Sequence, residues 1–221
     1  MSVKSFLDKY FKGSNTNTNT NTNTNTKTNT NEAVPVARDL DAYKLNVRVP
    51  FPTPQEVKTF HIFTDGACSD NGKKTARGGY SVYVYSKKDS GLHISEPLMK
   101  NEAQTNNRAE LRGIQAALDI LQKYESEWSK EYNDYCIWSD SEYSIHSLTK
   151  WATGWRRNGW KKSDGGLIQN LDLIKPIYEK LCSMSRVRLR HVRAHQKDRE
   201  HEFPFDGNTE ADRLARESVS R

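Results

Sequence analysis

The chain has 221 residues, a hydrophobic share of 34% and a formal net charge of +6, which suits one domain with an appendage and favours a polyanionic partner. No stretch approaches the roughly 18 apolar residues that span a bilayer, and the first residues lack the apolar run of a secretory signal, so we expect no membrane partner. The three cysteines are too scattered for a disulfide framework or a zinc site. We therefore expect reduced thiols in an intracellular protein, in the cytoplasm or the nucleus.

The residues before position 58 differ in composition from those after it. Residues 1–13 carry apolar side chains at helical spacing, but a lone helix of this length is unstable and orders only against a partner. Residues 14–31 are chiefly an Asn-Thr repeat that cannot bury apolar surface, which predicts a disordered linker. Residues 32–57 contain four prolines and predict an extended arm. Residues 58–221 are predicted to form the folded domain.

Within that domain, apolar and polar residues alternate where strands are expected, and apolar residues recur at helical spacing where helices are expected. The first three strands follow one another directly, which predicts an antiparallel meander, and a short, continuously apolar fourth strand predicts a parallel centre. The predicted strands are residues 59–68, 78–86, 92–100, 135–139 and 187–192, and the predicted helices are residues 105–124, 142–151, 167–181 and 210–218.

Asp65 ends the alternating part of the first predicted strand and precedes Gly66, and a lone Asp-Gly pair more often starts a turn. Three further acids change this interpretation: Asp140 ends the fourth strand, Glu110 lies in the first turns of a helix, and Asp212 lies in the first turn of the last helix. Neighbouring parallel strands end at one edge of a sheet, where Asp65 and Asp140 would converge. Four gathered carboxylates repel one another unless a hard divalent cation such as Mg²⁺ binds them. With phosphate as the remaining ligand, the expected reaction is phosphodiester hydrolysis with two metal ions.

Four motifs follow one another between about Thr59 and Ser218: IFTDGAC, TNNRAEL, IWSDSEYSIHSLTKWATGWRRNGW and GNTEADRLA. In this order they resemble the type 1 ribonuclease H family, whose stand-alone members carry a basic handle and cut the RNA strand of RNA–DNA hybrids. The resemblance implies an α/β fold with a mixed five-stranded sheet and helices on both faces. It also implies a monomeric endonuclease that uses two Mg²⁺ ions, or Mn²⁺ in their place, and leaves 5′-phosphate ends. Its biological role would be primer removal in DNA replication or the clearance of R-loops.

The resemblance further implies a role for each acid. Asp65 would bridge both metal ions, and Asp212 would hold the ion near the nucleophile. Glu110 and Asp140 would hold the ion near the leaving group. His195, just after the last strand, would move protons and help release product, which suits an imidazole. The alternative is an exposed loop histidine, which is how we interpret His61, His93, His146 and His201.

Recognition of the RNA strand depends on its 2′-hydroxyl groups, which lie in the wide minor groove and need short polar partners. Glu142 stands where some family members have glutamine, and it could still accept a hydrogen bond from a 2′-hydroxyl or a guanine amine. Asn208 is a further predicted substrate contact. For Thr105 and Asn106, the alternative to substrate binding is that they cap the helix that begins there. The other predicted contacts, all implied by the resemblance, are Cys68, Asn71, Asn106 and Asn107.

The resemblance implies separate contacts with the DNA strand. Thr105 and Asn170 match the pocket for a DNA phosphate, and Trp151 matches the residue that lies against a deoxyribose. The basic handle adds four charges that would act through phosphate contact and counterion release. The alternatives are a solvated charged face for these four, and simple packing for Trp155 and Trp160. The four basic residues are Arg156, Arg157, Lys161 and Lys162.

Residues 4–11 resemble the peptide by which replication enzymes bind sliding clamps, with Lys4 where glutamine is usual. A frayed tail, or nonspecific contact with membrane or nucleic acid, is the alternative. For the whole chain, the alternatives are an inactive hybrid-binding module, the nuclease part of a reverse transcriptase or integrase-like enzyme, and a structural tether. The four acids and the handle favour the stand-alone enzyme. The segment 196–207 is longer than in bacterial members, and such a flap can change turnover or metal affinity.

Overall fold

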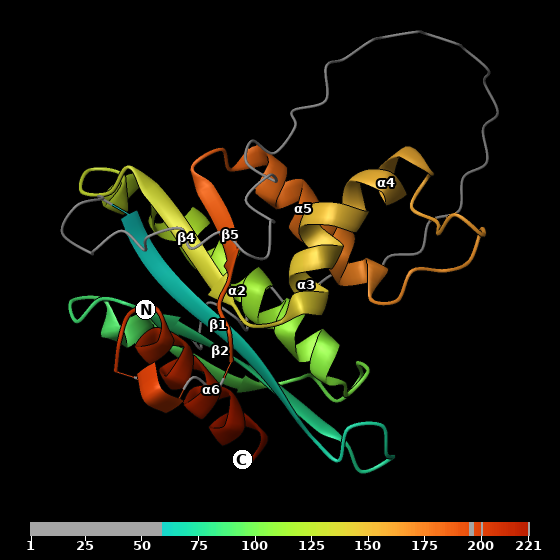
Figure 1. Cartoon of the computed structure of the whole chain (residues 1–221), viewed down its shortest axis with the longest axis horizontal. Helices are drawn as coiled ribbons and strands as arrows, with labels where there is room; N and C mark the ends of the chain where they lie inside the picture. Colours follow the sequence, from blue (N-terminus) through green and yellow to red (C-terminus); the bar gives the residue numbers. More distant parts are fainter. Residues whose placement is uncertain (1–58, 195–196, 200, 221) are drawn as a thin grey trace, which may run out of the picture. The chain divides into compact units, whose positions relative to one another are not determined.

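The sheet of this computed structural model has five strands in the order β3-β2-β1-β4-β5 (Figure 1). β1, β2 and β3 pair antiparallel, whereas β4 pairs in parallel with both β1 and β5. The predicted meander and the predicted parallel centre are both confirmed. The strands are β1 (Thr59–Ser69), β2 (Arg77–Val84), β3 (Ile94–Pro97), β4 (Asp134–Ser139) and β5 (Val187–His191).

The structure describes residues 59–194, 197–199 and 201–220. The predictions for residues 1–13, 14–31 and 32–57, with the clamp-binding peptide, lie outside this range, as does His195. The three cysteines are free thiols, as predicted. None of the helices in the described part of the chain combines the length and the apolar character that a membrane crossing needs.

Helices α2 (Asn106–Trp128) and α6 (Phe205–Val219) cover opposite faces of the sheet (Figure 1). Successive strand residues point to opposite faces, so Phe63 and Gly66 on β1 identify the two sides. A Cβ atom on Gly66 would lie 2.3 Å from the backbone nitrogen of Glu110 in α2. A Cβ atom on Gly207 of α6 would lie 2.3 Å from the ring of Phe63. Both helices therefore lie directly on β1.

The remaining helices lie between β4 and β5 in the sequence, apart from two short turns. The chain leaves β4 into α3, continues through one π-helical turn into α4, and then reaches α5, which packs beside α2. These helices are α3 (Glu142–His146), η3 (Ser147–Trp151), α4 (Ala152–Arg157) and α5 (Leu171–Ser183), and the short 3₁₀ turns are η2 (Ser90–Leu92) and η4 (Lys197–Arg199).

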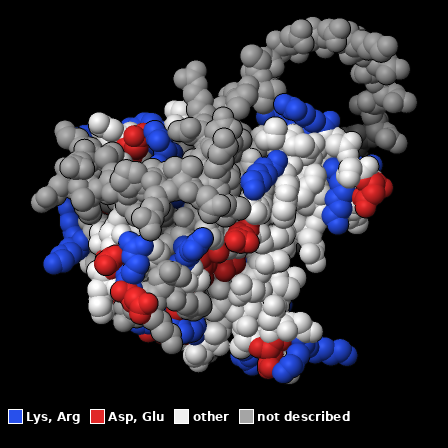
Figure 2. All heavy atoms as spheres, in the orientation of Figure 1, with Lys and Arg blue, Asp and Glu red and all other residues white. Residues whose placement is uncertain are grey.

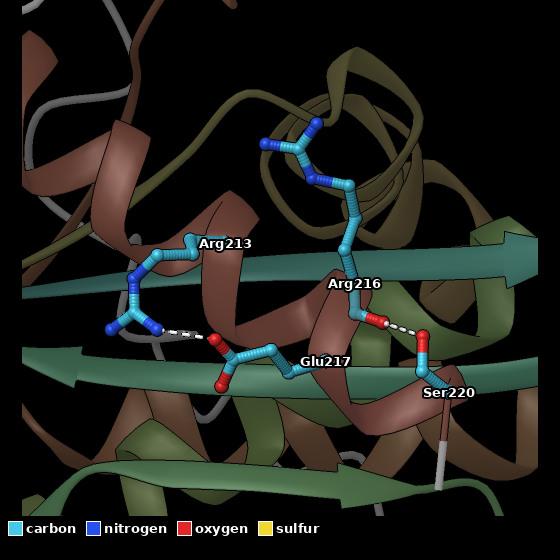
Figure 3. Close-up of a pocket in the computed structure, with 4 residues that line it drawn as sticks. All are labelled: Arg213, Arg216, Glu217 and Ser220. Atoms are coloured by element: carbon cyan, nitrogen blue, oxygen red, sulfur yellow. Dashed lines mark hydrogen bonds and ion pairs between the residues drawn. The ribbon is translucent and has the colours of Figure 1, made fainter.

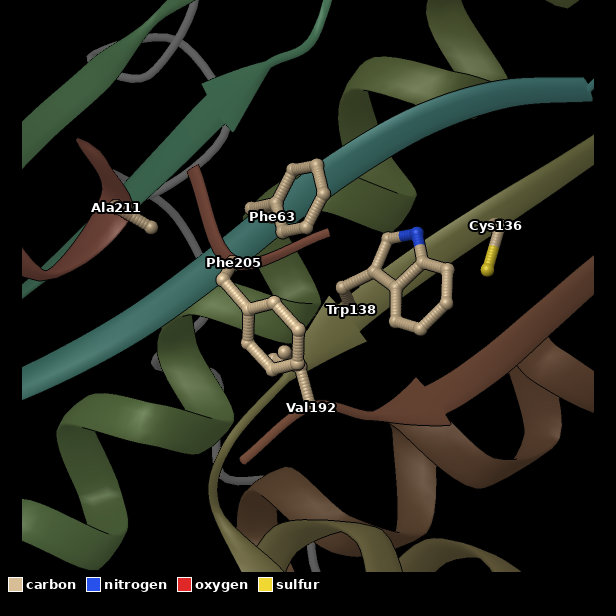
Figure 4. Packing of buried hydrophobic residues seen from close by; sticks show 6 residues of the cluster. All are labelled: Phe63, Cys136, Trp138, Val192, Phe205 and Ala211. Atoms are coloured by element: carbon tan, nitrogen blue, oxygen red, sulfur yellow. The ribbon is translucent and has the colours of Figure 1, made fainter. Parts of the chain in front are cut away.

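An apolar cluster between the sheet and α6 holds that helix in place. The rings of Phe63 and Trp138 stack with their centroids 5.9 Å apart. Phe203, just before α6, adds edge-to-face contacts with both rings, at 6.0 and 5.8 Å. Because these contacts come from β1, β4 and the segment before α6, they join the two sheet strands to the last helix. The six buried members are Phe63, Cys136, Trp138, Val192, Phe205 and Ala211 (Figure 4).

His61 belongs to this aromatic region, and our prediction of an exposed loop histidine was wrong for it. His61 lies within β1 and is only 6% exposed. Its Nδ1 atom accepts a hydrogen bond of 3.1 Å from Nε1 of Trp138, and the ring of Phe203 packs edge-on against it at 4.8 Å. Burial, followed by the charge of Arg190, lowers the pKa of His61 to about 4. This histidine is therefore a neutral hydrogen-bond acceptor in the core.

Two predicted helix starts were wrong. α6 begins at Phe205 and not at residue 210, because the buried side chains of Phe205 and Ala211 favour helix through a segment of polar sequence. Asp212 therefore lies in the third turn of α6 and not in its first. α5 begins at Leu171 and not at residue 167, because Asn170 adopts a left-handed backbone conformation with φ of 55°.

Candidate active site

Three acidic side chains from three different elements meet where the parallel pairing of β1 with β4 stops. Asp65 does not end its strand as predicted, because β1 continues to Ser69 in its pairing with β2. Asp65, Glu110 and Asp140 each offer a carboxylate oxygen, and these oxygens lie within 4.8 Å of one another. The register of the parallel pair explains two of them, since Thr64 lies opposite Ser139 and each is followed by an acid. The sheet edge that the sequence predicted for Asp65 and Asp140 is therefore where both carboxylates lie.

Gly66 allows the third acid to join them. A Cβ atom at this position would lie 2.3 Å from the backbone nitrogen of Glu110 and 2.7 Å from the carbonyl carbon of Ala109. Because only glycine lacks this atom, α2 can lie against β1 and bring Glu110 beside Asp65. In the sequence Gly66 is a turn signal beside Asp65, and no local pattern indicates this packing role.

Burial dominates the electrostatics of the cluster. Asp65 and Glu110 are only 6% and 4% exposed. Burial raises the pKa of the Asp65 carboxyl, and the charges of Asp140 and Asp212 raise it further. Burial also raises the pKa of Glu110, with added contributions from Asp65 and Asp140. Both acids therefore resist ionisation unless a positive charge lies beside them.

The hydrogen bonds of the cluster leave room for a cation. The backbone nitrogen of Gly66 donates to Oδ1 of Asp65 at 2.8 Å, and Nδ2 of Asn106 lies 3.4 Å from Oε1 of Glu110. Oε2 of Glu110 is buried and has no hydrogen-bond partner among the described residues. Such an atom is costly in a protein interior. Three carboxylates with a buried, unpaired oxygen fit a hard divalent cation, so Asp65, Glu110 and Asp140 could hold Mg²⁺.

Asp212 lies next to this cluster but outside the group of three carboxylates. It is half-buried on α6, and its carboxylate forms an ion pair with Arg216, one turn further along the helix. Its charge still raises the pKa of Asp65, so the two carboxylates are close enough to interact. Three of the four predicted metal ligands therefore meet in the structure, and the participation of Asp212 stays a prediction.

Two further polar residues support Asp140. Nδ2 of Asn208 donates a hydrogen bond of 3.3 Å to Oδ2 of Asp140, and a ring nitrogen of His191 lies 3.2 Å from the backbone oxygen of Asp140. Asn208 is 5% exposed, so its side chain lies beneath Asp140 and not on the outer surface. Packing of α6 on the sheet buries Asn208, and its role as a substrate contact stays a prediction.

A family model described as RNase H matches residues 57–220. The chain belongs to the ribonuclease H family. Ribonuclease H of Schizosaccharomyces pombe is 34% identical over 199 residues, covering 83% of this chain and 67% of that protein. Ribonuclease H1 of Homo sapiens is 31% identical over 189 residues, covering 86% of this chain and 56% of that protein. The chain thus spans between about half and two thirds of the length of these relatives.

A solved structure has the same fold. The solution structure of the PFV RNase H domain superposes with a TM-score of 0.56 at 21% sequence identity, covering 73% of this chain and 94% of that domain. The likeness confirms the predicted ribonuclease H fold, with its mixed five-stranded sheet and helices on both faces.

The start of α2 in this ribonuclease H domain carries several predicted substrate contacts. Thr105 caps the helix, because its hydroxyl accepts a hydrogen bond of 3.3 Å from the backbone nitrogen of Arg108. Oδ1 of Asn71 lies 3.4 Å from the backbone nitrogen of Asn106, and the thiol of Cys68 lies 3.5 Å from the backbone oxygen of Gln104. These contacts join the β1–β2 turn to the start of α2. The side chains that remain exposed here are Asn71 and Asn107.

Arg108 joins the two residues of the predicted DNA-phosphate pocket, and the sequence analysis missed it. Besides its backbone contact with Thr105, its guanidinium donates to Oδ1 of Asn170 at 3.4 Å. It also pairs with Asp172 and with Glu102. Thr105 and Asn170 are thereby held on one buried arginine, which is 8% exposed. The available signal was the position of Arg108 inside the ribonuclease H motif TNNRAEL.

The handle region presents aromatic and basic groups. Trp151 is 41% exposed, and its ring lies 5.7 Å from that of Trp155. Trp160 is half-buried against Tyr178, which agrees with the packing interpretation. Figure 2 shows basic side chains over the region of α4 and the segment after it. The exposed charged residues predicted to contact substrate here are Glu142, Arg156, Arg157, Lys161 and Lys162.

Proposed function

We propose that this chain is an endonuclease that hydrolyses the RNA strand of RNA–DNA hybrids and leaves 5′-phosphate ends. The observation that supports this most directly is the cluster of Asp65, Glu110 and Asp140 in a chain of the ribonuclease H family. A module that only bound hybrids would gain nothing from these three carboxylates, because their burial and mutual repulsion destabilise the fold.

The donor set favours Mg²⁺, which prefers carboxylate oxygens and keeps positions for water and phosphate. We propose two ions, with Mn²⁺ able to replace Mg²⁺, and Asp212 as the fourth protein ligand. When bound, the ions would lower the pKa of the attacking water and stabilise the leaving 3′ oxygen. His195 would carry protons and assist product release, because an imidazole titrates near neutrality.

The groups around the cluster orient its carboxylates. The backbone nitrogen of Gly66 holds one oxygen of Asp65, and Asn208 holds one oxygen of Asp140. Partners of this kind fix the direction of a ligand and raise metal affinity.

The exposed polar groups suit the two strands of a hybrid. Asn71 and Asn107, with Cys68 and Asn106 behind them, would contact the RNA minor groove, where the 2′-hydroxyls lie. Thr105 and Asn170 would hold a DNA phosphate, and Trp151 would lie against a deoxyribose. The basic residues of the handle would add salt-dependent affinity for the backbone. Glu142, exposed in the first turn of α3, would accept a hydrogen bond from the minor groove.

The test uses a labelled RNA–DNA hybrid with Mg²⁺, and double-stranded RNA and DNA of the same sequence as controls. The wild-type chain should cut only the hybrid, within its RNA strand. Asp65→Asn should abolish cleavage and keep hybrid binding, because the amide cannot bind the cation as a carboxylate does. Full-rate cleavage by this variant, or equal cleavage of all three duplexes, would contradict the proposal.

The partners outside the described residues form part of the same proposal. We propose that the domain acts as a monomer in the cytoplasm or the nucleus and that residues 4–11 bind a sliding clamp, on the basis of Leu7, Tyr10 and Phe11. A chain lacking residues 1–31 should still cut hybrids in solution and should lose clamp binding in a pull-down. Clamp binding by the shortened chain would show that this peptide is not the contact.

A further inference from the structure

Arg216 forms an ion pair with the acid that stands next to the carboxylate cluster. Its guanidinium contacts Oδ2 of Asp212, four residues earlier on α6. The side chain of Asp212 is 22% exposed and that of Arg216 is 65% exposed. An acid followed by a basic residue four positions later is a favourable arrangement on a helix, but an exposed pair of this kind is weak. The pair can therefore open when a stronger partner for Asp212 arrives.

The surroundings of the pair distinguish Arg216 from the other arginine on this part of α6. Arg213 pairs with Glu210 and Glu217, neither of which belongs to the cluster. Figure 3 shows that Arg213 points toward Glu217, whereas Arg216 leaves the helix in a different direction, although both arginines line the same shallow pocket. Two arginines of similar exposure thus have different neighbours.

The charge of Arg216 reaches the cluster itself. Arg216 lowers the pKa of Asp65, whereas Asp212 raises it, so both members of the pair lie within electrostatic range of that buried acid. Yet Asp212 is not one of the three carboxylates whose oxygens lie within 4.8 Å of one another. In the structure, the guanidinium of Arg216 pairs with the carboxylate of Asp212, which would be the fourth carboxylate of the cluster.

We propose that Arg216 competes with divalent cations for Asp212, so that the protein contains its own counter-ion for the fourth carboxylate. In the absence of a cation, Arg216 neutralises Asp212 and reduces its repulsion of Asp65. When a cation binds, Asp212 exchanges the guanidinium for the metal, and Arg216 is released toward solvent. Arg216 thereby lowers the affinity of the site for the metal ion. The proposal rests on the metal site of the proposed function.

The first experiment measures Mg²⁺ affinity directly, without substrate. Amide signals of the full-length chain are followed by NMR while MgCl₂ is added at constant ionic strength. Arg216→Ala should bind Mg²⁺ about three to ten times more tightly than the wild-type chain, because the competitor for Asp212 is removed. Arg213→Ala is the matched control, since it removes the same charge from the same helix, and it should change affinity by less than about twofold.

A second pair of variants tests whether Arg216 acts through Asp212. In an Asp212→Asn background the competitor has lost its partner, so adding Arg216→Ala should change Mg²⁺ affinity by less than about twofold. A change as large as in the wild-type background would mean that Arg216 acts only as a distant charge and would overturn the proposal.

The competition by Arg216 and the metal site itself can be refuted separately. If the wild-type chain binds Mg²⁺ but Arg216→Ala binds equally or less tightly, the competition is refuted while the proposed function stands. If the wild-type chain shows no shifts of the cluster residues even at millimolar Mg²⁺, the metal site itself is refuted, and the competition with it.

Discussion

Asn208 donates a hydrogen bond of 3.3 Å to Oδ2 of Asp140, and this bond connects α6 to the end of β4. The two residues are 68 positions apart in the chain, and Asn208 is buried, so its amide cannot leave this contact for solvent. The carboxylate of Asp140 is thereby oriented by a helix that also carries Asp212. The last helix thus contributes to the candidate site through a buried amide as well as through an acid.

Loss of this bond should weaken the metal site more than the fold. Asn208→Ala removes the amide that orients Asp140, and we expect about a tenfold loss of Mg²⁺ affinity with a matching fall in hybrid cleavage at limiting Mg²⁺. Metal titration by NMR measures the first effect, and gel assays measure the second. Thr209→Ala, on the exposed side of the same turn, should change neither. Equal effects of the two variants would show that Asn208 acts only through helix stability.

Stability of the metal-free domain should fall as the pH rises. The folded state raises the pKa of Glu110 above its ordinary value of 4.5, first through burial and then through Asp65 and Asp140. Folding therefore favours the protonated form, so this contribution is fully present below about pH 4.5 and is lost as the pH rises through the folded-state pKa. We expect the contribution of Glu110 to the Tm in EDTA to decrease as the pH rises above about 4.5.

Glu110→Gln should flatten this decrease and raise the Tm at neutral pH, because the amide carries no charge to bury. Circular dichroism melts across the pH range provide the measurement. Glu131→Gln is the control, since that exposed acid has a pKa lowered by Lys88 and lies away from the cluster. Added Mg²⁺ should stabilise the wild-type chain at neutral pH. A Tm that is independent of pH in the wild-type chain would contradict the assignment of buried acids.

The contact between Gly66 and α2 should not tolerate a methyl group. Gly66→Ala places a Cβ atom 2.3 Å from the backbone nitrogen of Glu110 and 2.7 Å from the carbonyl carbon of Ala109, and neither backbone atom can move without shifting α2. We expect a loss of about 1–3 kcal/mol or more in the free energy of unfolding, together with weaker Mg²⁺ binding. Denaturant melts provide the first value. Gly91→Ala, where a Cβ atom meets nothing within 4 Å, should cost little.

The role of Arg108 can be separated from simple stability by comparison with Arg112. Both arginines pair with Glu102, which is almost fully buried, but only Arg108 contacts Asn170. Arg108→Gln and Arg112→Gln should therefore each cost about 1–3 kcal/mol in unfolding free energy. Only Arg108→Gln should also raise KM for the hybrid, by about three- to tenfold, with little change in kcat. Equal KM values for the two variants would remove Arg108 from the phosphate pocket.

Local sequence patterns were enough to predict strands of the sheet and the acids of the candidate site. Alternation in residues 59–68 and 78–86 identified strands because the side-chain period of a strand is short and depends on nearby residues only. The motifs around Asp65, Glu110 and Asp140 identified the acids, because each carries its own recognisable context. The order of elements, the parallel centre and the edge at which two carboxylates meet all followed from these local signals.

Tertiary structure alone decided the contacts between distant segments. Burial of His61 against Trp138 and Phe203, and of Asn208 beneath Asp140, depends on α6 and the segment before it packing on the sheet, and no local period reports such packing. The same packing extends α6 back to Phe205 and so places Asp212 in the third turn of the helix. The energies of contacts between residues tens of positions apart, and not the local propensity of either segment, decide which residues become neighbours.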